Sequence, residues 1–104
     1  MDKELLQIFE GINSEGNCCQ KANELVRSMS SLGYTPRIRR IFHKSNVFGN
    51  NPFLNCEHVC GESYPQHFVV EVEGHIFDPK LGIPVSSLEY LEKAYSNYES
   101  LRIS

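Results

Sequence analysis

The sequence lacks tryptophan, long apolar runs and any excess of basic residues. A membrane-spanning helix needs about twenty consecutive apolar residues, and no stretch of that length is present, so we expect no membrane partner. Thirteen acidic and ten basic residues give a formal charge of −3, which argues against a nucleic-acid partner. The four cysteines are too few for a disulfide scaffold in a chain that can build a core, so we treat the thiols as reduced.

The composition that remains is typical of one ordinary globular domain. The 104 residues are 40% apolar and 22% charged, which suffices for one modest core but not for two domains. We therefore predict a single domain over residues 1–104. The N-terminal residues favour an acidic helix rather than a signal peptide. We therefore expect a cytoplasmic protein, or an effector that a secretion system delivers into a target cell.

Hydrophobic periodicity predicts an α+β domain. The pattern indicates helices over 2–12 and from Cys18 to about Ser31, strands over 37–42, 67–72 and 75–78, and an edge strand over 101–103. Residues 13–16 break the first helix, and Gly33 ends the second. Residues 43–66 read as a long surface loop. A last helix is expected from a cap at Ser86 or Ser87 to about Tyr95, with Leu88, Leu91 and Tyr95 buried.

Cys18 stands where the second helix is expected to begin, directly after a residue that can cap it. The short polar side chain of Asn17 can accept a hydrogen bond from a free backbone N–H of the first turn. The positive end of the helix dipole and the unpaired N–H groups lower the pKa of a thiol placed there. The same N–H groups can hold an oxyanion that forms when the sulfur attacks a carbonyl. Cys18 is therefore a candidate nucleophile.

The predicted hairpin supplies a candidate base and a group to orient it. If Glu73 and Gly74 form a two-residue turn, residue 72 pairs with residue 75, and Asp78 shares the face of His67. We expect this face to lie opposite the apolar core face, so that His67 is not a core residue. An imidazole beside Cys18 would take its proton, and Asp78 would fix the imidazole's orientation.

Three short segments, in this order, resemble the transglutaminase-like branch of the papain-like cysteine enzymes. Gly16-x-Cys18-x-x-x-Ala22 with residues 32–37 resembles the nucleophile helix and the strand after it. Residues 67–72 resemble the His-x-x-Val-Glu-Val strand, and Asp78-Pro79 resembles the family's Asp-Pro. The match covers about residues 14–80, in a minimal version similar in size to bacterial papain-fold toxin domains. The family's aromatic residues are replaced here by Val69 and Cys19.

The resemblance implies N-terminal helices packed on a small antiparallel sheet, with a catalytic triad of Cys18, His67 and Asp78. It also implies an amide substrate in a protein or peptide, a thioester acyl-enzyme and no metal or organic cofactor. The reaction class remains open among peptidase, deamidase and acyl transfer. A toxin or effector of this kind would have a cognate inhibitor protein as a further partner.

Four alternatives to the enzyme interpretation remain open. One is an inactive binding or regulatory domain with the same fold. Another uses the segment Cys56-Glu57-His58-Val59-Cys60, which offers thiolate and imidazole ligands for zinc but lacks a second ligand pair unless Cys18 joins it. In an oxidising compartment, Cys56 and Cys60 could form a disulfide. The adjacent Cys18 and Cys19 could form a redox switch.

Overall fold

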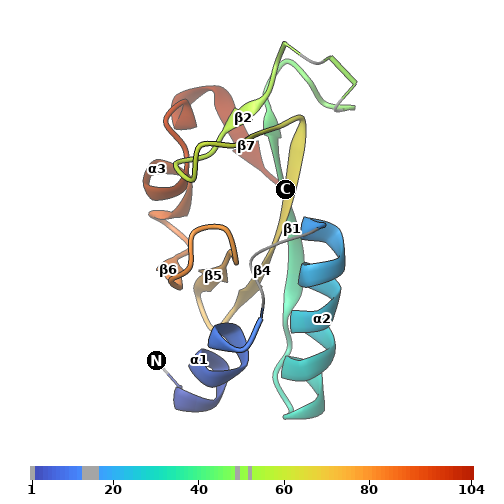
Figure 1. The fold of residues 1–104 in the computed structure, drawn as a ribbon, viewed down its shortest axis with the longest axis vertical. Helices are drawn as coiled ribbons and strands as arrows, with labels where there is room; N and C mark the ends of the chain where they lie inside the picture. The colour runs from blue at the N-terminus through green and yellow to red at the C-terminus, as the bar shows by residue number, and fades with distance from the viewer. Residues whose placement is uncertain (1, 13–16, 49, 52) are drawn as a thin grey trace.

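Two N-terminal helices pack on one side of a curled antiparallel sheet in the computed structural model, which describes residues 2–12, 17–48, 50–51 and 53–104. These are α1 (Lys3–Glu10) and α2 (Cys18–Ser31), and α3 (Tyr90–Ala94) lies on the other side (Figure 1). The predicted α+β class, with N-terminal helices on an antiparallel sheet, is confirmed at this level. None of the described helices is both long and apolar enough to cross a membrane.

The main sheet has five strands in the spatial order β6–β5–β4–β1–β7, and every neighbouring pair is antiparallel. Its strands are β1 (Arg37–His43), β4 (Gln66–Val72), β5 (His75–Phe77), β6 (Val85–Ser86) and β7 (Leu101–Ile103). A second sheet pairs β2 (Cys56–Glu57) with β3 (Ser63–Tyr64). The prediction of a continuous loop over 43–66 is therefore wrong at these strands, because two-residue strands are too short to show alternation.

Local hydrogen bonds fix both ends of α2. The side-chain oxygen of Asn17 accepts a hydrogen bond of 2.8 Å from the backbone N–H of Cys19, which confirms the predicted cap. At the other end, Gly33 has φ +92°, and the N–H of Tyr34 bonds back to the carbonyl of Met29 at 3.2 Å. This is the usual way in which a left-handed glycine ends a helix. The predicted break over residues 13–16 lies outside the described residues.

The hairpin between β4 and β5 has the predicted register. Val72 pairs with His75, and Val70 pairs with Phe77. The turn residues Glu73 and Gly74 both have positive φ, 55° and 75°, as a tight two-residue hairpin turn requires. The strand β5 ends at Phe77, so the first residues of β4 have no partner in β5, and the chain leaves the sheet there.

Both faces of the sheet are buried. Residues of α1 and α2 pack with Val70, Val72 and Phe77 on one face, and the other face packs against α3. That second cluster contains Ile41, Cys56, Val69, Ile76, Tyr90, Ala94, Tyr95 and Leu101. The expectation that His67 is not a core residue is therefore wrong, because α3 and the segment carrying β2 and β3 cover its face of β4.

The last helix is shorter than predicted. It begins at Tyr90 after Glu89, and Ser86 belongs to β6, where Val85 pairs with Ile76 of β5. Pairing with β5 holds this segment extended, so it cannot join the helix. Leu88 is 97% exposed, which contradicts its predicted burial, whereas Tyr95 is buried as predicted. The predicted edge strand over 101–103 is confirmed as β7, which pairs with β1.

Candidate active site

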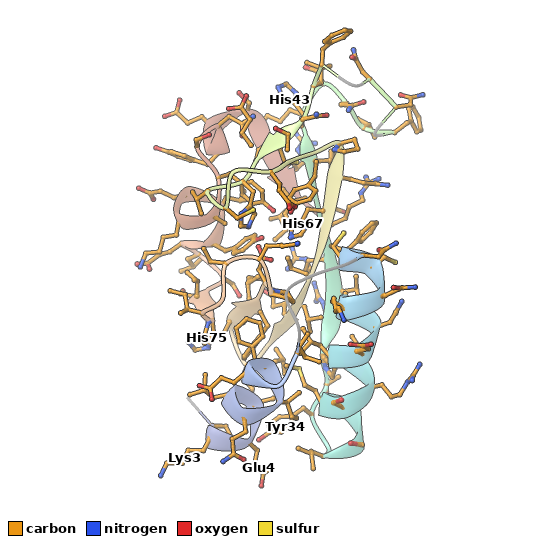
Figure 2. All side chains as sticks on the ribbon, viewed as in Figure 1. Lys3, Glu4, Tyr34, His43, His67 and His75 are labelled. Carbon is orange, nitrogen blue, oxygen red and sulfur yellow. The ribbon has the colours of Figure 1, made fainter. Side chains whose placement is uncertain are left out.

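A buried histidine and a buried aspartate meet where the hairpin opens. Nε2 of His67 lies 3.0 Å from Oδ1 of Asp78, and both side chains are fully buried. Figure 2 shows His67 in the interior of the molecule, near the start of β4. The predicted convergence of these two residues is thus present in the structure. It follows from the hairpin register, since a slip of one residue would turn the two side chains to opposite faces.

Four donors converge on the carboxylate of Asp78. Its Oδ1 accepts from Nε2 of His67 and from the backbone N–H of Lys80, each at 3.0 Å. Its Oδ2 accepts from Nε2 of His58 at 2.8 Å and from the hydroxyl of Tyr90 at 2.7 Å. Burial tends to raise the pKa of Asp78, but the hydrogen bonds from His58 and His67 outweigh burial and hold the pKa well below its usual range. The carboxylate is therefore ionised and held in place.

The hydroxyl groups of two buried tyrosines form a chain behind this carboxylate. Tyr90 donates its only hydroxyl hydrogen to Asp78, so the contact of 3.0 Å between Tyr90 and Tyr95 requires Tyr95 to be the donor. Burial and the charge of Asp78 raise the pKa of both phenols. Both tyrosines therefore remain protonated and act as hydrogen-bond donors.

The two hydrogen bonds of the His58 ring fix which of its nitrogens carries the hydrogen. Its Nδ1 accepts a hydrogen bond of 3.0 Å from the backbone N–H of Cys60, so this nitrogen carries no hydrogen. The hydrogen of the neutral ring therefore sits on Nε2, which donates to Asp78. His58 is 4% exposed, and neither of its nitrogens is free.

A metal ion is the rival interpretation of this cluster. The ligand atoms of His58, His67 and Asp78 lie within 4.8 Å of one another, and this donor set suits zinc. A nitrogen that holds a metal must offer a lone pair, whereas Nε2 of His58 carries a hydrogen and donates it to the carboxylate. The residues fit a hydrogen-bonded cluster better than a metal centre.

The zinc site considered for residues 56–60 is also disfavoured by these contacts. Both nitrogens of His58 are engaged elsewhere, and the buried Sγ of Cys56 contacts the carbonyl of Ile41 at 3.6 Å. Burial raises the pKa of Cys56 to about 11, so its thiol is protonated and unreactive at neutral pH. All four cysteines carry free thiols in this structure.

The half-buried thiol of Cys18 and the imidazole of His67 influence each other. Burial tends to raise the pKa of Cys18, but the influence of His67 and of the backbone at Phe68 outweighs burial and lowers the pKa. The other ring nitrogen of His67, Nδ1, is buried and has no hydrogen-bond partner among the described residues, so the predicted hydrogen bond to Cys18 is not formed in this structure. Because Nε2 is occupied by Asp78, Nδ1 is the nitrogen left to serve the thiol.

The imidazole of His67 is a strong base in this setting. Burial tends to lower its pKa, but the hydrogen bond to Asp78 and the interaction with Cys18 outweigh burial and raise the pKa to about 9. The ring of Tyr64 stacks on the imidazole, with centroids 4.6 Å apart and planes inclined by 20°. This stacking fixes the plane of the ring. At neutral pH the arrangement favours a thiolate beside an imidazolium.

Sequence reasoning missed His58, Tyr64, Tyr90 and Tyr95 as members of this site. His58 lay in the segment considered for zinc, and Tyr95 was predicted only as a buried residue of the last helix. The signal that could have found His58 is a histidine in a segment too long to be an ordinary loop. The tyrosines offered no distinguishing spacing.

Comparisons with protein-family models, curated proteins and solved structures found no match for this chain. The resemblance to transglutaminase-like enzymes therefore remains a prediction from three short motifs.

Proposed function

We propose that this protein is a cysteine-dependent enzyme that acts on amide bonds of a protein or peptide, with Cys18 as nucleophile, His67 as general base and acid, and Asp78 as the group that orients His67. The observation that carries the proposal is the buried contact of 3.0 Å between His67 and Asp78, which leaves the other ring nitrogen of His67 without a partner; the influence of His67 on the pKa of the half-buried Cys18 thiol supports it. This combination is the usual requirement for activating a thiol nucleophile.

The first half-reaction forms a thioester. The Cys18 thiolate attacks the amide carbonyl carbon, and the electron pair of the carbonyl moves onto its oxygen. Free N–H groups at the start of α2, with the positive end of the helix dipole, can stabilise this oxyanion. When the tetrahedral intermediate collapses, the carbon–nitrogen bond breaks and the imidazolium of His67 transfers its Nδ1 proton to the leaving amine.

The second half-reaction releases the thiolate. Neutral His67 takes a proton from water or from an acceptor amine, which attacks the thioester carbonyl. Collapse of the second tetrahedral intermediate breaks the carbon–sulfur bond. The acid product, or a new amide, leaves, and the thiolate–imidazolium pair is restored. The acceptor decides between hydrolysis by water and transfer to an amine, and the amide attacked decides whether hydrolysis cleaves a peptide bond or deamidates a side chain.

The same proposal covers the biological setting. The resemblance to papain-fold toxin domains supports an effector that acts inside a target cell and has a cognate inhibitor protein. The simpler alternative is an enzyme that acts in the cytoplasm. A neighbouring reading frame whose product binds this protein tightly and blocks Cys18 would support the effector.

A catalytically inactive binding domain is the rival function, and one observation favours it. Phe48 and Phe53 are 84% and 91% exposed in the segment between β1 and β2. Buried Asn46 braces this segment, because its amide donates to the carbonyls of Asn51 and Leu54 at 3.1 and 3.0 Å. A braced segment that exposes aromatic rings is typical of a protein-binding surface.

Site-specific alkylation and turnover separate the two functions. Iodoacetamide at pH 6, followed by mass spectrometry, should modify Cys18 well before exposed Cys60, which serves as a reference within the same molecule. Cys18→Ala and His67→Ala should each abolish hydrolysis of a peptide-amide library. Cys18→Ala should preserve the circular dichroism spectrum, and His67→Gln, which fills more of the fully buried site, controls for the packing that His67→Ala loses. Equal alkylation of the two thiols, or unchanged turnover in either variant, would overturn the enzyme proposal.

A further inference from the structure

The inference concerns His58, and it rests on the proposed function. His58 belongs to the turn after β2, and its side chain reaches the carboxylate oxygen that His67 does not use. We propose that His58 is a positioning residue that acts through Asp78: its Nε2–H takes up part of the negative charge of the carboxylate and so limits the charge that Oδ1 presents to His67.

The tautomer of His58 makes it a donor of fixed direction. The backbone N–H of Cys60 occupies Nδ1, so the ring presents Nε2–H to Asp78 and has no alternative acceptor role there. A neutral donor keeps the carboxylate ionised without adding a competing positive charge. Among the groups that contact Asp78, His67 is therefore the one whose protonated form the carboxylate stabilises most.

The backbone around His58 is anchored on two sides, which makes the position of the ring well defined. The N–H of His58 bonds the carbonyl of Glu62 at 3.0 Å, across the turn between β2 and β3. The N–H of Val59 bonds the carbonyl of Ala94, in α3, at 2.8 Å. The ring itself lies edge-on to Tyr95, with centroids 5.1 Å apart. A side chain held by its backbone, its ring and both nitrogens has little freedom to move.

His58 shares Oδ2 with Tyr90, and this sharing predicts the sign of its effect. Removing one donor leaves more negative charge on the carboxylate, while Tyr90 and the N–H of Lys80 still hold its orientation. His67 then faces a stronger negative charge and keeps its proton to higher pH. The other titratable groups that surround the two side chains are Cys18, Tyr64 and Tyr95, with Glu62 and Lys80 paired at 3.7 Å nearby.

The decisive measurement is the titration of the imidazole of His67 by long-range proton–nitrogen NMR, which needs no substrate. In His58→Phe, which keeps a ring but loses the donor, we expect the midpoint to rise by about one pH unit, because the free energy of a hydrogen bond to a charged group corresponds to a pKa change of about that size. In His58→Gln, whose amide can donate to the same oxygen, the midpoint should return toward that of the wild type. His75→Gln changes a histidine outside the cluster and should leave the midpoint unchanged.

Two results would overturn the proposal: a His67 midpoint that stays or falls in His58→Phe, or one that rises equally in His58→Phe and His58→Gln. A purely structural role for His58 would lower stability but would not raise the midpoint in His58→Phe and restore it in His58→Gln. If His58→Phe fails to fold, the nitrogen shifts of wild-type His58 decide, because a ring protonated on Nδ1 at pH 7 would contradict the role. Failure of the enzyme proposal would show separately, as slow alkylation of Cys18 in a protein whose His67 titration still responds to His58.

Discussion

Replacing Asp78 with asparagine should remove the negative charge that keeps His67 protonated. In the wild-type protein the pKa of His67 rises from 6.5 to about 9, which corresponds to about 3 kcal/mol of interaction favouring the imidazolium. Burial acts in the opposite direction. Without the carboxylate charge, we therefore expect the pKa of His67 to fall to its ordinary value or below it.

The consequence for Cys18 has a definite sign. In the wild-type protein the imidazolium persists below about pH 9 and favours the neighbouring thiolate. In Asp78→Asn the imidazole is mostly neutral at pH 7, and the thiolate population should fall by up to about a hundredfold, the equilibrium factor that about 3 kcal/mol represents, since part of the shift of His67 comes from Cys18 itself. The two proteins should converge above pH 9, where the wild type loses its imidazolium and the variant thiol ionises without help.

Alkylation kinetics between pH 5 and pH 10 test this prediction. The measurement uses a Cys19→Ser background, so that the modified sulfur is unambiguous, with exposed Cys60 as the internal reference. Near-ultraviolet circular dichroism checks that Asp78→Asn keeps its tertiary packing. A folded variant whose Cys18 reacts at pH 6.5 as fast as in the wild type would refute the reasoning that the carboxylate activates the thiol through His67.

Four further predictions concern stability and metal dependence. Leu25→Ala should lower the free energy of unfolding in urea by about 2–5 kcal/mol, because Leu25 is fully buried against the sheet. Gly74→Val should cost about 1–2 kcal/mol in the same assay, since a side chain is strained at φ 75°, whereas a cost near zero would contradict the turn geometry. Unfolding free energy should decrease as the pH falls below about 4, where unfolded Asp78 binds a proton that folded Asp78 still resists, and Asp78→Asn should weaken this dependence without abolishing it, because the pKa values of Asp2, Glu62 and Glu71 are also lowered. Removal of metal ions with EDTA should change neither the urea midpoint nor the rate at which Cys18 is alkylated. A lower midpoint or slower alkylation after EDTA treatment would support a metal at the cluster of His58, His67 and Asp78.

Features set by short-range rules could be predicted from the sequence. Asn17 caps α2 through a residue two positions away, and the turn at Glu73 and Gly74 fixes the hairpin register. That register in turn brings His67 to Asp78, so a contact between residues eleven positions apart follows from a two-residue turn.

Features set by long-range packing could not be predicted in this way. His58 reaches Asp78 only because the turn after β2 bonds to α3, and no periodicity in the sequence reports this contact. The burial of His67 has the same origin, since the alternating pattern of β4 identifies one core face but not the elements that cover the other. The predicted strand over 75–78 ends one residue earlier in the structure, at Phe77 of β5. This end, and the pairing of β6 with β5, likewise depend on partners distant in the chain.

The order in which the chain is made separates the thiol from the groups that activate it. Cys18 leaves the ribosome before Asp78 and its donor Tyr90, which lie further along the chain. On the function proposed above, a nascent chain therefore carries an ordinary thiol, and Cys18 becomes reactive only after α3 has docked. A cell that translates the protein would then meet the proposed nucleophile only in folded molecules, the form that the proposed inhibitor protein would recognise.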